Sequence, residues 1–433
     1  MNIRKITNFD YLLFLAVVLL SFIGVLFIYS SGINSAGELV SKEYVKQILW
    51  VCTGIVLLLL SCIYDYRRIK DRTFLIYLVG MILLLYTGIF GTVRHNARSW
   101  IGLKNLGIQP SEFIKLIFIL FLAYYLDKSQ NEEPLKRFIK AIAIMIVPVA
   151  LILKQPDLGT ASVYIPIFLI MCFIAGIPLR FILYVFFLGV LTIVFTLMPL
   201  WEEIILKTSH VMTNILKNSQ VSIIILFAMG ISTVIAMIGN VLLKRRYYYW
   251  IAYVLSLITV AFAGSIVGVR ALKEYQMMRL IIFLDPEVDP LKHGWNIIQS
   301  ITAIGSGGFM GRGYLMGTQS HYRYLPEQST DFIFSILSEE WGFLGGIFVF
   351  FLYSIVFFRF FLSIKRCDDL FGKLIVSGIL AMFFFHFFVN VGMVMGIMPI
   401  TGIPLLFLSY GGSSLWTAMI SVGVVIGINL RQL

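Results

Sequence analysis

Long apolar runs recur along almost the whole chain, and this repetition constrains the fold more than any other feature. About 20 helical residues cross the roughly 30 Å hydrocarbon core of a bilayer. With 59% hydrophobic and only 13% charged residues, the chain is not an ordinary water-soluble protein. The sequence predicts an all-α polytopic membrane protein, one integral domain over residues 1–433. We place about twelve transmembrane helices near residues 11–30, 46–64, 74–91, 112–126, 138–153, 159–176, 181–200, 221–243, 247–268, 332–358, 371–398 and 414–430.

Basic residues in the short loops predict the orientation of these helices. Positive charge is enriched in cytoplasmic loops, and the clusters fall on one side if both termini are cytoplasmic. The first run follows Arg4-Lys5 without a small-residue cleavage site, so we expect a retained helix rather than a signal peptide. The clusters that set the orientation are Arg67, Arg68, Lys70 and Arg72; Lys128, Lys136 and Arg137; Lys244, Arg245 and Arg246; and Lys365, Arg366 and Lys373.

Other basic residues gather on the opposite, outer side, where translocation disfavours needless positive charge. Any one of them is explained as solvated loop charge, but the clusters together favour an anionic ligand at the outer surface. The four cysteines and five histidines predict neither a disulfide framework nor a structural zinc site. The outer clusters are Arg94, Arg98, Lys104 and Lys115, and Arg270, Lys273, Arg279, Lys292, Arg312 and Arg323.

Residues 269–330 form an outer loop that is too long for a passive connector. It contains an amphipathic piece, Lys273 to Leu284, suited to the membrane interface. A glycine-rich stretch follows at residues 305–313. Such a stretch allows close approach of backbone amides to phosphate, and it equally allows close packing at a membrane surface.

Acidic side chains lie at and below the outer start of the tenth run. Asp331 stands at its mouth, where a carboxylate caps free amides or takes part in catalysis. Glu339 and Glu340 follow about 12 Å deeper at 1.5 Å per residue. Acids at that depth usually face a cavity or a partner, so both are functional candidates.

Further polar residues interrupt the apolar pattern near the same outer face. Glu112 and Lys115 are three apart and can pair on one helix face, as a structural ion pair or in direct chemistry. Asp157, in the turn after Lys154, is suited to cap the sixth run. Breaks also occur at Asn390, Gly392, Pro399, Gly402, Pro404, Gly411 and Gly412. Such breaks survive in lipid only where protein or a water-filled cavity receives the backbone groups. A polar constellation on one face suggests a lipid-linked or extracytoplasmic anionic substrate.

These motifs, in this order, resemble the SEDS family of bacterial cell-wall synthesis, which comprises the RodA, FtsW and SpoVE proteins. Gly317-Thr318-Gln319 is similar to the RodA branch rather than the division branch. The matching segments are 99–101, 109–112 with Lys115, 155–160, 283–286, 294–296, 299–308, 325–327, 330–334, 390–393, 402–404 and 409–414.

The resemblance implies a peptidoglycan glycosyltransferase that polymerises lipid II at the outer face of the bacterial cytoplasmic membrane, for elongation and rod shape. Asp331 matches the family's essential aspartate, and Glu112 and Lys115 match its polar pair in the fourth helix. The implied substrate-binding residues are Arg98, Glu112, Lys115, Asp157, Arg279 and Glu327. The implied partners are lipid II, undecaprenyl-linked glycan, a class B penicillin-binding protein and the elongation machinery, with no nucleic acid.

Two departures from the family pattern stand out. Ser99 directly precedes Trp100, where many members have arginine, and Arg98 lies one residue earlier. The family usually has ten helices, whereas residues 201–268 add two apolar runs. We interpret this segment as a two-helix insertion, whose even number preserves the side on which Asp331 lies.

The expected reaction joins a 4-hydroxyl of one disaccharide to the anomeric carbon of another and displaces a lipid pyrophosphate. It needs one base, for which Asp331 is suited, and charge stabilisation by Arg98, Lys115 or Arg279. One carboxylate predicts inversion. We expect no metal site and no tightly bound cofactor, with Mg²⁺ or Mn²⁺ as optional assistance. The alternatives are a flippase for lipid-linked precursors and a non-catalytic scaffold for a transpeptidase.

Overall fold

The computed structural model describes residues 9–94, 97–103, 106–204, 218–271, 274–291 and 294–431. Lys104, Lys273 and Lys292 of the predicted basic clusters therefore lie outside the described residues, as do the side chains of Arg94 and Arg270. The chain divides into two compact units. The first comprises Met1–Ile177 and Gln299–Leu433, and the second comprises Pro178–Ile298.

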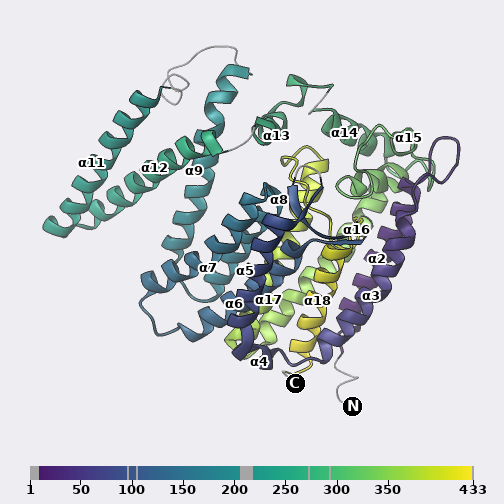
Figure 1. The fold of residues 1–433 in the computed structure, drawn as a ribbon, viewed down its shortest axis with the longest axis horizontal. Helices are drawn as coiled ribbons and strands as arrows, with labels where there is room; N and C mark the ends of the chain where they lie inside the picture. Colours follow the sequence, from purple (N-terminus) through teal and green to yellow (C-terminus); the bar gives the residue numbers. More distant parts are fainter. Residues whose placement is uncertain are drawn as a thin grey trace. The chain divides into compact units, whose positions relative to one another are not determined.

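Helices make up most of the first unit, and each predicted apolar run within it is helical (Figure 1). α16 is the longest helix, and Gly342 interrupts it with a φ of 64° and a ψ of −158°. The helices are α2 (Tyr11–Ser31), α3 (Glu43–Ile63), α4 (Tyr66–Ile69), the 3-10 turn η1 (Lys70–Arg72), α5 (Thr73–Phe90), α6 (Pro110–Lys128), α7 (Pro134–Lys154), α8 (Leu158–Ile174), α14 (Trp295–Gly307), which begins at the end of the second unit, α15 (Thr318–His321), α16 (Ile333–Arg366), α17 (Leu370–Val394) and α18 (Gly412–Asn429).

The interior of the first unit is formed by α17 and α18, which are buried along most of their length. α18 packs against α3, α17 packs against α6 and α8, and α16 packs against α2 and α17. These neighbours come from distant parts of the sequence, so burial of the two C-terminal helices closes the bundle. Because α17 touches α6, α8 and α16, polar residues near its end can meet residues from all three.

A three-stranded antiparallel sheet precedes α6, and the apolar pattern of the sequence does not predict it. The strands β1 (Thr92–Arg94), β2 (Ala97–Leu103) and β3 (Leu106–Ile108) pair in chain order. Arg98 and Ser99 alternate across β2, as successive strand residues do: Arg98 is exposed, whereas Ser99 is buried. Arg98 thus points to the opposite face of the strand from Ser99, which stands directly before Trp100 where many family members have arginine.

The second unit contains α9 (Leu179–Ile204), α11 (Ser219–Leu243), α12 (Arg246–Ala271), α13 (Glu274–Leu284) and the 3-10 turn η2 (Pro286–Val288). α12 packs against α9 and α11, and α13 packs against α9. Helix α13 coincides with the predicted amphipathic piece. α11 and α12 occupy the two apolar runs of residues 201–268, whose interpretation as an insertion stays a prediction.

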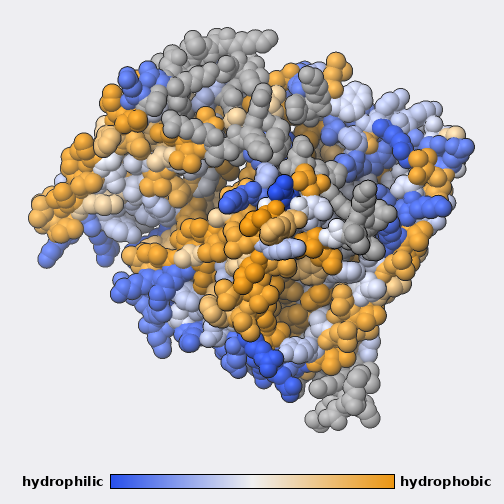
Figure 2. Space-filling view, viewed as in Figure 1, coloured by the Kyte–Doolittle hydropathy of each residue, from blue (hydrophilic) through white to orange (hydrophobic). Residues whose placement is uncertain are grey.

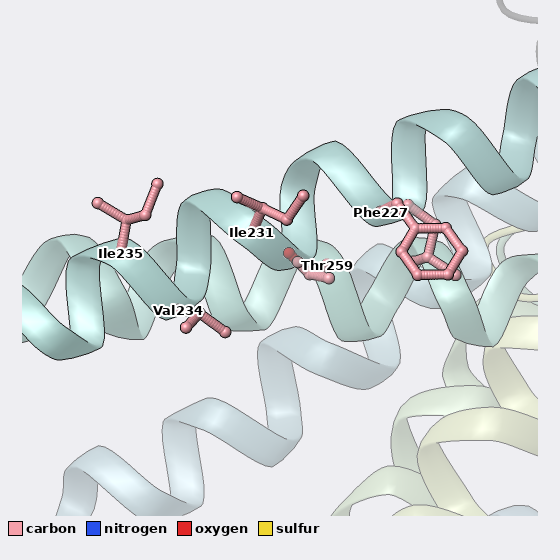
Figure 3. A pocket seen from close by; sticks show the side chains of 7 residues that line it. Phe227, Ile231, Val234, Ile235 and Thr259 are labelled. Carbon is pink, nitrogen blue, oxygen red and sulfur yellow. The ribbon is translucent and has the colours of Figure 1, made fainter.

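An apolar groove runs along α11 and α12 within the second unit (Figure 3). Its volume is about 480 Å³, and Phe227, Ile231, Val234 and Ile235 from α11 line it together with Thr259 from α12. The Thr259 hydroxyl donates to the Leu255 carbonyl at 2.7 Å. A lining of this kind suits hydrocarbon rather than a charged substrate, so the groove is no candidate for the chemical site.

The surface composition fits a protein that crosses a membrane several times. Among the described residues, nine helices are long and apolar enough to span a bilayer, and α8 is a shorter apolar helix. The two other predicted spans, α6 and α7, are helical but carry more charge. Figure 2 shows hydrophobic residues over the helices of the first unit and hydrophilic residues gathered near α4, at the lower edge. We therefore treat the chain as a multi-pass membrane protein.

Candidate functional site

Asp331 lies in a tight turn immediately before α16. The N-cap residue of that helix is Phe332, which makes no side-chain cap, so Asp331 does not hold the N-cap position. The Glu327 carbonyl accepts hydrogen bonds from the amides of Thr330, Asp331 and Phe332 at 3.3, 3.1 and 3.4 Å. Glu327 adopts a φ of 50°, a strained value for a side-chain-bearing residue. Its backbone therefore shapes the turn that presents Asp331.

The segment 399–405, between α17 and α18, forms the surface beside this carboxylate. A Cβ added to Gly402 would lie 3.6 Å from Asp331 Oδ2, which brings the aspartate next to the Gly402 Cα. Gly402 has a φ of 71°, a conformation that glycine adopts without steric cost. The side-chain amide of Asn390 on α17 donates to the carbonyls of Asp331 at 3.0 Å and Ile403 at 2.8 Å.

Asp157 belongs to a second polar group at the same end of the unit. It caps α8 by accepting from the Thr160 amide at 2.9 Å and the Thr160 hydroxyl at 2.8 Å, as the sequence predicts. The Gln109 side-chain amide donates at 3.1 Å to Oδ2, the same oxygen that accepts from the Thr160 hydroxyl. A Cβ at Gly159 would collide with the Thr401 carbonyl, so α8 begins in direct contact with segment 399–405. Segment 399–405 therefore contacts the elements that carry Asp157 and Asp331.

Glu112 and Lys115 form the predicted ion pair, and it is buried. The Lys115 ammonium lies 2.9 Å from both Glu112 oxygens, and the two residues are 1% and 4% exposed, respectively. A third contact, at 3.1 Å, joins Lys115 Nζ to His386 Nε2 on α17. The three N–H donors of the ammonium are thus matched by three acceptors within the protein.

The remaining predicted substrate-binding arginines lie on the surface of their own units. Arg98 on β2 is exposed, and its guanidinium donates to the Ile89 carbonyl at 3.1 Å. Arg279 on α13 is exposed in the second unit. Both predicted substrate-binding arginines therefore present charge at the surface of their own unit.

Glu339 and Glu340 contact protein, as their depth predicts. Glu339 accepts from the amides of Thr318 and Gln319 at 2.7 and 2.9 Å, at the start of α15. Glu340 accepts from Ser30 and from the Leu315 amide. These two acids thus bind the segment that leads to Asp331.

The glycine-rich stretch of residues 305–313 packs against α16. A Cβ at Gly307 would collide with the Ser338 carbonyl, and one at Gly311 would collide with the Glu340 carbonyl. Nearby, burial raises the pKa of Tyr314 to about 12, and its hydroxyl donates to the Leu26 carbonyl at 2.9 Å. Of the two interpretations of this stretch, the structure supports close packing.

His386 is not among the predicted site residues, and Asn390 is predicted only as a break in an apolar run within a family-like segment. Both side chains are at most 1% exposed, and both make polar contacts inside the bundle. A histidine and an asparagine four residues apart in an otherwise apolar helix share one face, and this spacing was the available signal. Their hydrogen-bond partners, however, are distant in sequence.

The first unit is a bundle of apolar helices, and its polar end carries Asp331. This arrangement indicates a multi-pass membrane protein with a polar site at one end of its helices. The sequence profile named FTSW_RODA_SPOVE and described as "Cell cycle protein" matches residues 10–205 and 204–432. The chain belongs to this family, as its motifs indicate.

Relatives within the family extend over the whole chain. Peptidoglycan glycosyltransferase RodA of Treponema pallidum (strain Nichols) is 59% identical over 433 residues and covers 100% of both chains. Peptidoglycan glycosyltransferase MrdB of Escherichia coli (strain K12) is 29% identical and covers 89% of this chain and 85% of its own. The fold is similar to that of a chain in a structure described as "Structural coordination of polymerization and crosslinking by a peptidoglycan synthase complex", with a TM-score of 0.66, 24% identity and 98% of both chains covered.

Proposed function

We propose that this chain is a peptidoglycan glycosyltransferase of the RodA type, which polymerises lipid II at the outer face of the cytoplasmic membrane during cell elongation. Full-length similarity to a glycosyltransferase of that name supports the activity. The observation that carries the choice of site is the position of Asp331 beside Gly402, at the polar end of the first unit. A carboxylate at a polar end of an apolar bundle suits a substrate whose lipid tail stays in the bilayer.

Asp331 acts as the general base in this proposal. It takes the proton of the glucosamine 4-hydroxyl of one disaccharide as that oxygen attacks the anomeric carbon of another. The bond from the anomeric carbon to the lipid pyrophosphate breaks, and the pyrophosphate leaves as a stable anion without a general acid. A single displacement with one carboxylate inverts the anomeric configuration. A positioned base of this kind contributes roughly 10²–10⁴-fold to the rate.

Charge stabilisation of the pyrophosphate falls to exposed basic residues. We assign it to Arg98 of the first unit, because Lys115 is occupied by Glu112 and His386, while Arg279 of the second unit stays a prediction from the family resemblance. Asp157 and Glu327 remain candidates for contacts with the sugars. No resident cofactor enters the proposal; a divalent cation such as Mg²⁺ or Mn²⁺, if it arrived with the substrate, would add charge stabilisation to the pyrophosphate.

The proposed setting follows from the same assignments. All twelve helical runs cross the cytoplasmic membrane, both termini face the cytoplasm, and residues 269–330 form an outer loop. The chain works with a class B penicillin-binding protein, which cross-links the new glycan strands. One similar fold comes from a structure described as a peptidoglycan synthase complex, and this supports a partner that performs the cross-linking.

Purified full-length protein given labelled lipid II, alone and with its transpeptidase, tests the proposal. We expect glycan chains from the unmodified protein and at least a roughly 100-fold loss of polymer with Asp331→Asn or Asp331→Ala. The matched control is Asp369→Asn. Asp369 also precedes a helix, caps α17 through the Gly372 amide at 3.0 Å, and lies at the opposite end of that helix from Asn390. This variant retains polymerisation.

The alternatives give different results in the same assay. Undiminished polymer from both Asp331 variants would refute the base role. Translocation of lipid II across a vesicle membrane without polymer would favour a flippase. Neither polymer nor translocation, from the protein alone or with its transpeptidase, would favour a scaffold.

A further inference from the structure

Segment 399–405 is irregular backbone that is partly buried in the bundle, and side chains bond the carbonyls of Ile403 and Pro404. Ile403 and Leu405 are 2% and 0% exposed. The Leu405 amide donates to the Ser409 hydroxyl at 2.8 Å, and the Ile403 carbonyl accepts from Asn390. Buried backbone groups without such partners are costly in a membrane protein. The conformation of this segment therefore depends on the groups that bond it.

One face of α17 supplies two of these groups. His386 and Asn390 are four residues apart and project from the same side of the helix. His386 Nδ1 lies 2.9 Å from the Pro404 carbonyl oxygen, next to the Ile403 carbonyl that Asn390 binds. The second hydrogen bond of the Asn390 amide goes to the Asp331 carbonyl at 3.0 Å. A single helix face thus binds both segment 399–405 and the backbone of the aspartate.

The partners of His386 determine its tautomer. A carbonyl oxygen can only accept, so Nδ1 carries the proton and donates to Pro404. Nε2 is then the acceptor, and the Lys115 ammonium donates to it across 3.1 Å. Because Lys115 also binds Glu112, the hydrogen bonds run without a gap from α6 through His386 to segment 399–405. Each member of this network has a defined donor or acceptor role.

We infer that His386 and Asn390 are positioning residues that keep segment 399–405 and Asp331 in register at the site. Gly402 directly precedes the bonded Ile403 and Pro404 carbonyls and lies next to Asp331 Oδ2, so a displacement of the segment also displaces the backbone beside the carboxylate. This inference rests on the proposed role of Asp331 as the base. The Glu112–Lys115 ion pair of α6 would then influence the site through the hydrogen bond between Lys115 and His386.

Two conservative variants of His386 separate its two bonds. Asparagine places an amide N–H close to the Nδ1 position and preserves a donor for Pro404, but it is too short to reach Lys115. Glutamine reaches the Nε2 position and preserves an acceptor for Lys115, but it has no second donor placed for Pro404. The matched control is Ser377→Ala, because Ser377 is buried on the same helix and bonds only the Leu374 carbonyl in its own turn, at 2.9 Å.

The measurements are the lipid II concentration dependence of polymerisation, the apparent melting temperature, and hydrogen–deuterium exchange of the amides in residues 400–408. We expect His386→Gln to lower kcat about tenfold with KM within about twofold, because a small misplacement of a catalytic group costs kcat rather than binding. We also expect faster exchange in residues 400–408. His386→Asn recovers most of kcat and of the protection, and Ser377→Ala resembles the unmodified protein.

Several outcomes would overturn the inference. Unchanged exchange in His386→Gln would show that the segment does not depend on the Pro404 bond. Equal kcat in all variants would show that His386 does not position the site. Equal losses in the asparagine and glutamine variants, with a lowered melting temperature, would assign His386 to general stability. The proposed function is tested separately, by the polymerisation activity of Asp331→Asn. Full activity of that variant would refute the base role, but it would not change the exchange measured in residues 400–408.

Discussion

Replacing Lys115 by methionine leaves the Glu112 carboxylate buried without its cation. The two residues are 1% and 4% exposed, and the ammonium contacts both carboxylate oxygens at 2.9 Å. Removal of one partner from a buried pair costs about 3–5 kcal/mol, because the remaining charge loses both its partner and its access to water. Methionine keeps the length of the lysine stem, so the loss is chiefly electrostatic.

The assay is the apparent melting temperature of the purified protein. With an unfolding entropy of about 2.1 cal/mol/K per residue, the 433-residue chain loses about 1 °C per kcal/mol, and we expect a fall of about 3–5 °C. The matched control is Lys136→Met on α7. Lys136 also pairs with a glutamate three residues away, Glu133 at 3.2 Å, but the side chains are 73% and 59% exposed. Solvent screens that pair, so its loss shifts the melting temperature by less than about 1 °C.

The double variant Glu112→Gln/Lys115→Met decides whether the reasoning is correct. It removes both charges together, and a buried pair replaced by neutral groups is often as stable as the original. We expect the double variant to recover most of the lost melting temperature. A double variant that melts below Lys115→Met, or a single variant that melts like the unmodified protein, would refute the electrostatic account.

Two further substitutions test how the site is built. Gly402→Ala places a side chain at a φ of 71° and costs about 1–2 kcal/mol of strain, so we expect a lower melting temperature and slower polymerisation. Preserved rate and stability would show that the segment relaxes freely. Glu339→Gln weakens charge-assisted hydrogen bonds to the amides at the start of α15, which are worth about 1.5–3 kcal/mol each. Hydrogen–deuterium exchange of the Thr318 and Gln319 amides should rise, and unchanged exchange would argue against that role.

The sequence predicts the helices well because their signal is local. Each predicted apolar run is helical, and the described helices coincide with the predicted intervals within a few residues at most ends. The largest difference is α16, which continues to Arg366 rather than ending near residue 358. The apolar residues beyond 358 extend the helix towards the basic residues Lys365 and Arg366, which favour a helix C-terminus.

Contacts between distant segments are what the sequence does not predict. The sheet of residues 92–108 was missed because its strands are short and lie among charged loop residues. The acids of α16 illustrate the same limit: their depth indicates partners, but only the fold identifies Ser30 and the amides of residues 315–319. Asp331 and Asp157, the residues proposed for the site, could be singled out from the sequence because they lie within recognisable motifs.

The interrupted stretch after α17 explains why these distant residues meet. Pro399, Gly402 and Pro404 prevent a continuous helix, so several carbonyls in the interior of the bundle lack intrahelical donors. Polar side chains of α17 supply those donors, and this accounts for His386 and Asn390 in an otherwise apolar helix. The same asparagine binds the Asp331 carbonyl. The irregular backbone of segment 399–405 therefore depends on His386 and Asn390 for its hydrogen bonds. Because Asn390 also binds the Asp331 carbonyl, it holds the aspartate beside this segment.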